Sequence, residues 1–142
     1  MSHRAIQGCW RLIAGALPCA VAAVVVVIII PVLATNAFPG WRAHPSIIAF
    51  ALTAVLHALV GTFALRSNRS SGAISVWLGV ATLMLGFILL DAAFAFTERP
   101  DLRVAVIAIF ICAMSDFAAT TSVFVMAFMR SRAAGKPIRL FE

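Results

Sequence analysis

Three ionisable residues lie inside long apolar stretches of the sequence, namely His57, Asp91 and Asp116. An aspartate at the centre of a membrane helix costs roughly 2.5–3.5 kcal/mol on insertion scales, so such residues turn away from lipid and commonly mark proton or ion pathways. Imidazole also gains and loses a proton near neutral pH. These residue types therefore indicate either proton or cation binding, or polar contacts that hold helices together.

Asp116 lies in the segment CAMSDFAATTS, residues 112–122, which is rich in small and hydroxyl-bearing residues. At helical steps of three and four, Asp116 shares a face with Cys112, Ala113, Ala119 and Thr120. Small residues let membrane helices approach closely, and polar residues then bond across the contact. We expect this face to look into a helix bundle or toward a partner.

Two more stripes of small residues occur in the preceding apolar stretches. His57 shares a helical face with Ala54, Ala58 and Gly61. The other stripe consists of Ser75, Gly79, Thr82 and Gly86. Both predict close helix packing.

Several roles are open for Asp116 and His57. In a structural role, the carboxyl group, protonated or paired with His57, would anchor one helix to another. In a functional role, Asp116 would bind a proton or cation and His57 would relay it. Alternatively, His57 could ligate haem iron or a chlorophyll magnesium through a neutral ring nitrogen, because its small neighbours leave room for a macrocycle. The sequence itself requires no cofactor.

The position of Asp91 is less unusual for a charged residue. It lies about 8 Å from the outer end of its apolar stretch, at 1.5 Å per helical residue. There it could reach water, or pair with one of three arginines, Arg42, Arg99 or Arg103.

The composition predicts an integral membrane protein. Of the 142 residues, 63% are hydrophobic and 11% charged, whereas a soluble domain has about 45–50% apolar and about 25% charged residues. A membrane helix needs about 20 apolar residues, and four stretches qualify: residues 12–34, 47–65, 74–96 and 104–129. We therefore expect an all-α, four-helix transmembrane bundle that forms a single domain over residues 1–142.

The basic residues predict the orientation. Eight lie on one side of the four spans: Arg4, Arg11, Arg66, Arg69, Arg130, Arg132, Lys136 and Arg139. Three lie on the other: Arg42, Arg99 and Arg103. Because positive loops favour the cytoplasm, both termini should be cytoplasmic, with the protein in the inner or plasma membrane of the cell. Orientation explains the net charge of +6 better than nucleic-acid binding does, since the cations are scattered over short segments.

No hydrolase, kinase or zinc motif occurs, and the three cysteines lack metal-site spacing, so neither an enzyme nor a metal site is expected. The leading interpretation is an accessory or structural subunit of a larger membrane complex. It would contact lipid and pack through its small-residue faces against other membrane subunits or against itself. The alternative is a small oligomeric proton-coupled transporter or channel that uses Asp116 and His57. A subunit that ligates haem or chlorophyll through His57 is the third interpretation.

Overall fold

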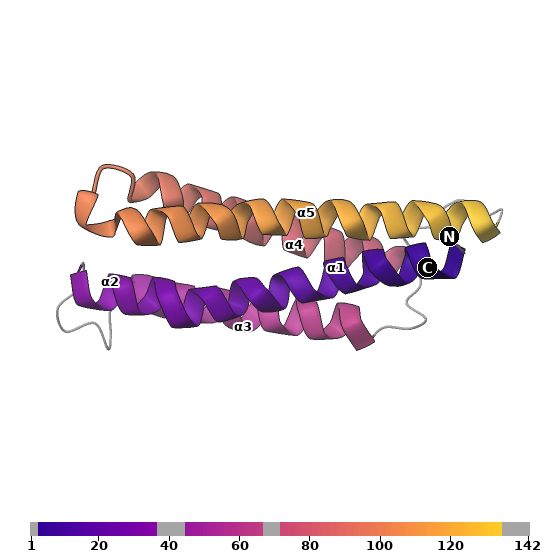
Figure 1. Cartoon of the computed structure of the whole chain (residues 1–142), viewed down its shortest axis with the longest axis horizontal. Coiled ribbons are helices and arrows are strands. Elements are labelled where there is room, and N and C mark those ends of the chain that lie inside the picture. Colours follow the sequence, from indigo (N-terminus) through magenta and orange to yellow (C-terminus); the bar gives the residue numbers. More distant parts are fainter. Residues whose placement is uncertain (1–2, 37–44, 67–71, 135–142) are drawn as a thin grey trace.

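The computed structural model describes residues 3–36, 45–66 and 72–134, and these are helical apart from a short turn at residues 96–99. The elements in chain order are α1 (His3–Val24), the π-helical turn η1 (Val25–Ile29), α2 (Ile30–Asn36), α3 (Pro45–Arg66), α4 (Gly72–Ala95), the 3₁₀ turn η3 (Pro100–Leu102) and α5 (Arg103–Ala134). Because α1, η1 and α2 follow one another without a break, they form one long rod beside α3, α4 and α5 (Figure 1).

Four helical segments are long and apolar enough to cross a membrane: Gly8–Asn36, Pro45–Arg66, Val76–Ala95 and Pro100–Met129. The all-helical class and the four predicted apolar helices are therefore confirmed. The helices extend beyond several of the predicted spans, and α5 continues to Ala134. An apolar run marks only the part of a helix that suits hydrocarbon, because the backbone hydrogen bonds can continue through polar residues on either side.

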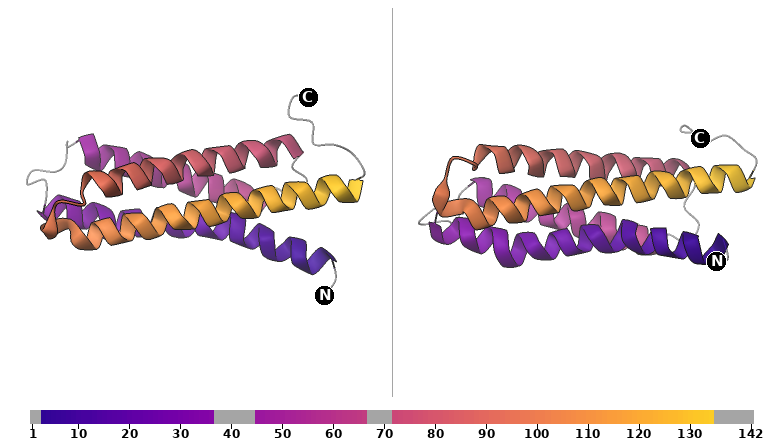
Figure 2. Two further views of the ribbon diagram at one scale, coloured as in Figure 1. Left: turned by 90° about the horizontal axis from the view of Figure 1, so that it is seen from above. Right: turned by 45° about the horizontal axis from the view of Figure 1, so that its top comes forward.

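The rods run lengthwise beside one another (Figures 1 and 2). At one end, here named the terminal end, α1 begins and α5 ends; at the other, named the turn end, residues 96–102 connect α4 to α5. The closest neighbours are α4 and α5, and α1 packs against both α3 and α5. By contrast, α3 and α4 touch only sparsely.

The apolar core lies along the first rod and its neighbours. Val25, Ile29 and Leu33 are fully buried, and they belong to the same cluster as Leu89 of α4 and Ile109 of α5. Many large apolar side chains instead cover the outer surface, for example Leu52, Leu59, Phe63, Phe94 and Phe128. An apolar exterior of this kind suits lipid, where packing rather than exclusion from water holds helices together.

The π-helical turn is explained by the proline that follows it. The backbone N–H of Ile30 donates to the carbonyl of Val25, one residue further back than in an α-helix. The turn ends two residues before Pro31, whose ring would crowd the carbonyl of Val27 in a regular α-helix. The widened turn thus accommodates a proline within a continuous rod.

The first rod and α3 cross at two glycines. A Cβ atom added to Gly61 would lie 2.7 Å from the carbonyl oxygen of Gly15 and 2.6 Å from Cys19 Sγ. Only hydrogen fits there, so the two backbones touch directly. This contact fixes the depth of α3 relative to α1 and thereby helps to position His57, one turn from Gly61.

Candidate functional site

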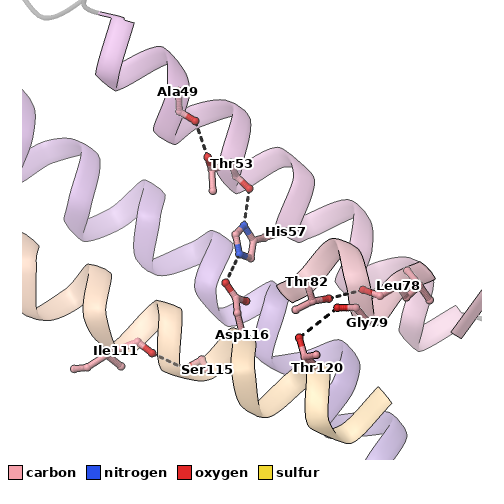
Figure 3. Close-up of polar contacts among 10 residues, drawn as sticks. All are labelled: Ala49, Thr53, His57, Leu78, Gly79, Thr82, Ile111, Ser115, Asp116 and Thr120. Atoms are coloured by element: carbon pink, nitrogen blue, oxygen red, sulfur yellow. Dashed lines mark hydrogen bonds and ion pairs between the residues drawn. The ribbon is translucent and has the colours of Figure 1, made fainter. Parts of the chain in front are cut away.

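The structure brings together the two ionisable residues near the middle of their helices. His57 Nε2 of α3 lies 2.8 Å from Asp116 Oδ2 of α5, across a sequence separation of 59 positions. Both side chains are fully buried, with 0% exposure. Sequence alone left open whether they meet, and Figure 3 shows them facing each other across the bundle.

The other ring nitrogen of His57 is held by its own helix. Nδ1 lies 2.7 Å from the carbonyl oxygen of Thr53, one turn earlier on α3 (Figure 3). A carbonyl oxygen can only accept a hydrogen bond, so Nδ1 carries a proton and donates it. This bond fixes the rotation of the ring and directs Nε2 at Asp116.

The two bonds together determine how many protons the pair holds. With Nδ1 protonated, the contact between Nε2 and Oδ2 contains one shared proton, carried either by the carboxyl group or by the ring. Both forms have a net charge of zero. Without that proton, a lone pair of Nε2 would face a lone pair of Oδ2 at 2.8 Å. If the ring instead moved its proton from Nδ1 to Nε2, the lone pair of Nδ1 would face the Thr53 carbonyl oxygen. The arrangement in this structure is therefore the net-neutral pair, with one proton on Nδ1 and one shared between Nε2 and Oδ2.

The second carboxyl oxygen of Asp116 is the exception in an otherwise bonded site. Oδ1 is buried and has no hydrogen-bond partner among the described residues, and Figure 3 shows it turned away from His57. A buried acceptor without a donor costs about 1–3 kcal/mol. The helix α4 packs closely here, because a Cβ atom on Gly86 would lie 3.1 Å from Asp116 Cβ.

The pair belongs to a row of buried polar side chains on α3, α4 and α5. In the described part of the chain these are Thr53, His57, Thr82, Asp116, Thr120 and Ser122. Thr53 lies four residues toward the turn end from His57, and Ser122 lies six residues toward the terminal end from Asp116. At 1.5 Å per residue the row extends about 15 Å along the bundle. These six are the buried polar or charged side chains of the described residues.

Each hydroxyl in this row donates to a backbone carbonyl. Thr53, Thr82 and Ser122 donate to the carbonyl four residues earlier, at 2.8 Å. Thr120 instead reaches from α5 to the Gly79 carbonyl of α4, at 3.4 Å. Their oxygen lone pairs remain available to accept a hydrogen bond.

Asp91 lies outside this site. It is exposed on α4, and of its expected partners, Arg99 bonds to Asp101 instead, at 3.0 and 2.7 Å. Arg42 lies outside the described residues. The structure therefore does not pair Asp91 with Arg99.

Most residues of the small-residue stripes pack against other helices of the same chain. Ala54, Gly61, Gly79, Gly86 and Ala119 are buried, and Ala58 is half-buried; Ser75 lies outside the described side chains. The residue that sequence reasoning missed is Thr53, whose carbonyl orients the His57 ring. Its position one turn before His57 was the available signal.

His57 has no ring nitrogen left for a metal in this arrangement, because both are hydrogen-bonded. Ligation of haem or chlorophyll would require one of these bonds to break. Within the described ranges, no group of three or more His, Cys, Asp or Glu side chains could hold a metal ion.

Comparison with protein-family models, with curated proteins and with solved structures finds no match to this chain. No relative therefore supplies a role for the pair, and its function is argued from its geometry.

Proposed function

We propose that the chain is an integral membrane protein with all four apolar helices inserted and both termini cytoplasmic, in the inner or plasma membrane. Support comes from the four apolar helices and from the distribution of charge. Arg66 and Arg132 lie at the terminal end, whereas of Arg99 and Arg103 at the turn end, Arg99 is paired with Asp101. Uncompensated positive charge favours the cytoplasmic side.

Within this bundle, we propose that His57 and Asp116 form the proton-binding site of a small proton-coupled transporter or channel. The observation that carries the proposal is the fully buried 2.8 Å contact, whose two members share one proton. A second proton, or the loss of the shared one, leaves a net charge at the site. An isolated charge in the low-dielectric interior costs several kcal/mol. Proton exchange is therefore coupled to separation of the pair or entry of water.

The sparse contact between α3 and α4 is where such an opening would cost least. Toward the turn end, a groove of about 220 Å³ already separates these helices, lined by residues that include Phe50, Thr53, Ile88 and Leu89. Thr53 lies at this groove and also holds the His57 ring. A solute or water in the groove would thus act directly on the residue that orients the proton-binding ring.

Proton flux into vesicles tests this proposal. The side chain of Asp116→Asn still donates a hydrogen bond to His57 Nε2 but cannot ionise. The variant therefore removes proton exchange while it keeps the hydrogen bond between the helices. We expect the purified chain in liposomes, under a pH gradient and with a pH-sensitive dye inside, to conduct protons. Asp116→Asn should reduce the flux to that of protein-free vesicles.

Ser115→Ala is the matched control, because its hydroxyl donates only to the Ile111 carbonyl on its own helix, at 2.9 Å. It should retain the flux of the unaltered chain. Equal flux through Asp116→Asn, or no flux through the unaltered chain at any pH, would contradict the proposal.

An accessory subunit of a larger membrane complex is the second candidate. One observation favours it: the Asp91 side chain is exposed among apolar side chains on the outer surface of α4. The small-residue faces are buried within the chain, so a partner would have to meet a different surface.

A further inference from the structure

Oδ1 of Asp116 is a buried hydrogen-bond acceptor to which no described residue donates. The Asp116 side chain has no exposed surface, and its other oxygen is bonded to His57. Cys112, one turn earlier on α5, is also buried, but its thiol does not bond to Oδ1. Buried carboxyl oxygens are normally bonded to the protein or to ordered water. Oδ1 therefore indicates a donor from outside the described chain.

Two buried threonines lie beside this oxygen, where α4 packs on α5. A Cβ atom added to Gly86 would lie 3.1 Å from Asp116 Cβ. The Gly79 carbonyl, two turns away on α4, accepts a hydrogen bond from Thr120 of α5. Thr82 lies between these two glycines, one turn from each. Thr82 and Thr120 are buried, and Figure 3 shows both on the side of Asp116 to which Oδ1 points.

The hydroxyl hydrogens determine what these side chains can bind. Thr82 donates to the Leu78 carbonyl at 2.8 Å, an ordinary length, so its remaining lone pairs can only accept. The bond from Thr120 to the Gly79 carbonyl is 3.4 Å, longer than the usual distance of about 2.7–2.8 Å. The Thr120 hydroxyl can therefore turn to a closer acceptor. The site offers two acceptors and one donor.

We propose that one water molecule binds here, between α4 and α5. It donates to Asp116 Oδ1 and to Thr82 Oγ1, and it accepts from the Thr120 hydroxyl. Three hydrogen bonds are typical of a buried water molecule. A metal cation fits less well, because it would leave the long Thr120 bond as it is and would add charge beside a pair that is already neutral.

The bound water gives the shared proton a route of exchange. This role rests on the proposed proton-binding function, whereas the water site itself does not. A hydronium ion formed at this position transfers one proton to Oδ1 and becomes water again. The carboxyl group is then neutral, and the shared proton belongs to His57 Nε2, so the pair has gained one positive charge. Because Thr120 lies toward the terminal end from Asp116, this exchange occurs on the side opposite the groove at Thr53.

Magnetisation transfer from water to the Asp116 carboxyl carbon, measured by solid-state NMR in lipid bilayers, tests the water site. With Asp91 and Asp101 replaced by Asn, Asp116 is the only aspartate in the chain, so a ¹³C label on aspartate reports on it alone. We expect rapid transfer from water protons to Asp116 Cγ. The Cγ signal should be the same in sodium and in choline buffers, because the site binds no metal cation.

Three variants make this measurement specific. Thr82→Val has nearly the same shape but no hydroxyl group, so it should lose most of the transfer, and Thr82→Ser should retain it. Ser122→Ala is the matched control, because the Ser122 hydroxyl is also buried but donates to the Ala118 carbonyl of its own helix. This control should behave as the unaltered chain.

Proton flux in liposomes tests the exchange role separately. Thr82→Val should lose most of the flux of the unaltered chain, while the ¹⁵N signals of the His57 ring stay the same because the pair is intact. Full flux through Thr82→Val would overturn the exchange role.

The two failures are distinguishable. No water transfer to Asp116 in the unaltered chain, equal transfer in Thr82→Val, or a Cγ signal that shifts between sodium and choline would overturn the water site. Water transfer without any proton flux through the unaltered chain would support the water site and contradict the proton-binding function.

Discussion

Asp116→Ala should lower the free energy of unfolding by about 3–5 kcal/mol, the cost of removing one partner of a buried pair. The change leaves the fully buried His57 ring without the partner for Nε2, and it removes the only described bond between the side chains of α3 and α5 at this depth. SDS-induced unfolding in mixed micelles, followed by circular dichroism, measures the loss.

Two companion variants make this result specific. His57→Ala should cost a similar amount, and the double variant should cost much less than the sum, because each single change leaves one buried group unpaired. Asp116→Asn should cost only about 1 kcal/mol, since its amide still donates to Nε2. Additive losses, or an Asp116→Ala change within about 0.5 kcal/mol of the unaltered chain, would show that the pair does not hold the helices together.

Gly61→Ala should lower the free energy of unfolding by about 1–3 kcal/mol, because the added methyl group overpacks the crossing of α1 and α3. Its Cβ atom would lie 2.7 Å from the Gly15 carbonyl oxygen and 3.0 Å from the Cys19 backbone nitrogen. These backbone atoms cannot turn aside as a flexible side chain could, so the helices must separate. The same unfolding titration measures the effect.

Gly8→Ala is the matched control on α1, because nothing lies within 4 Å of a Cβ atom at that position. There the higher helix propensity of alanine should be neutral or stabilise the chain, by up to about 1 kcal/mol. If both substitutions had the same effect, backbone contact at Gly61 would not be the cause.

The helices were predictable from sequence, whereas the contacts between them were not. Length and apolarity alone predict the four segments, because hydrocarbon demands about 20 apolar residues. The cost of a charge in lipid likewise predicts that Asp116 faces inward. Its pairing with His57 could not be predicted, because the order of helices around a bundle is determined by the fit of side chains from distant parts of the chain.

The other features that the sequence did not predict depend on local structure. Arg99 was a possible partner for Asp91, but Asp101 is two residues away, and Arg99 donates to both of its carboxyl oxygens through Nε and Nη2. A local pair of this kind closes almost no loop and therefore has the lower entropic cost. The π-helical turn before Pro31 could not be predicted either, because it depends on backbone details that composition does not contain.

The burial of the small-residue stripes changes the balance between the two functional interpretations. Gly61 and Gly86 serve contacts within the chain, so they no longer favour a partner. The contact of His57 with Asp116 supports a proton-binding site instead, and the remaining argument for a partner is the exposed carboxylate of Asp91 on α4.

The most direct test of the shared-proton pair is ¹⁵N NMR of the His57 ring in lipid bilayers. With His3 and His44 replaced by Gln, His57 is the only histidine in the chain. We predict a protonated, hydrogen-bonded Nδ1, and an Nε2 signal that changes strongly in Asp116→Ala but not in Ser115→Ala. Nε2 signals that are the same with and without the Asp116 carboxyl group would contradict the account.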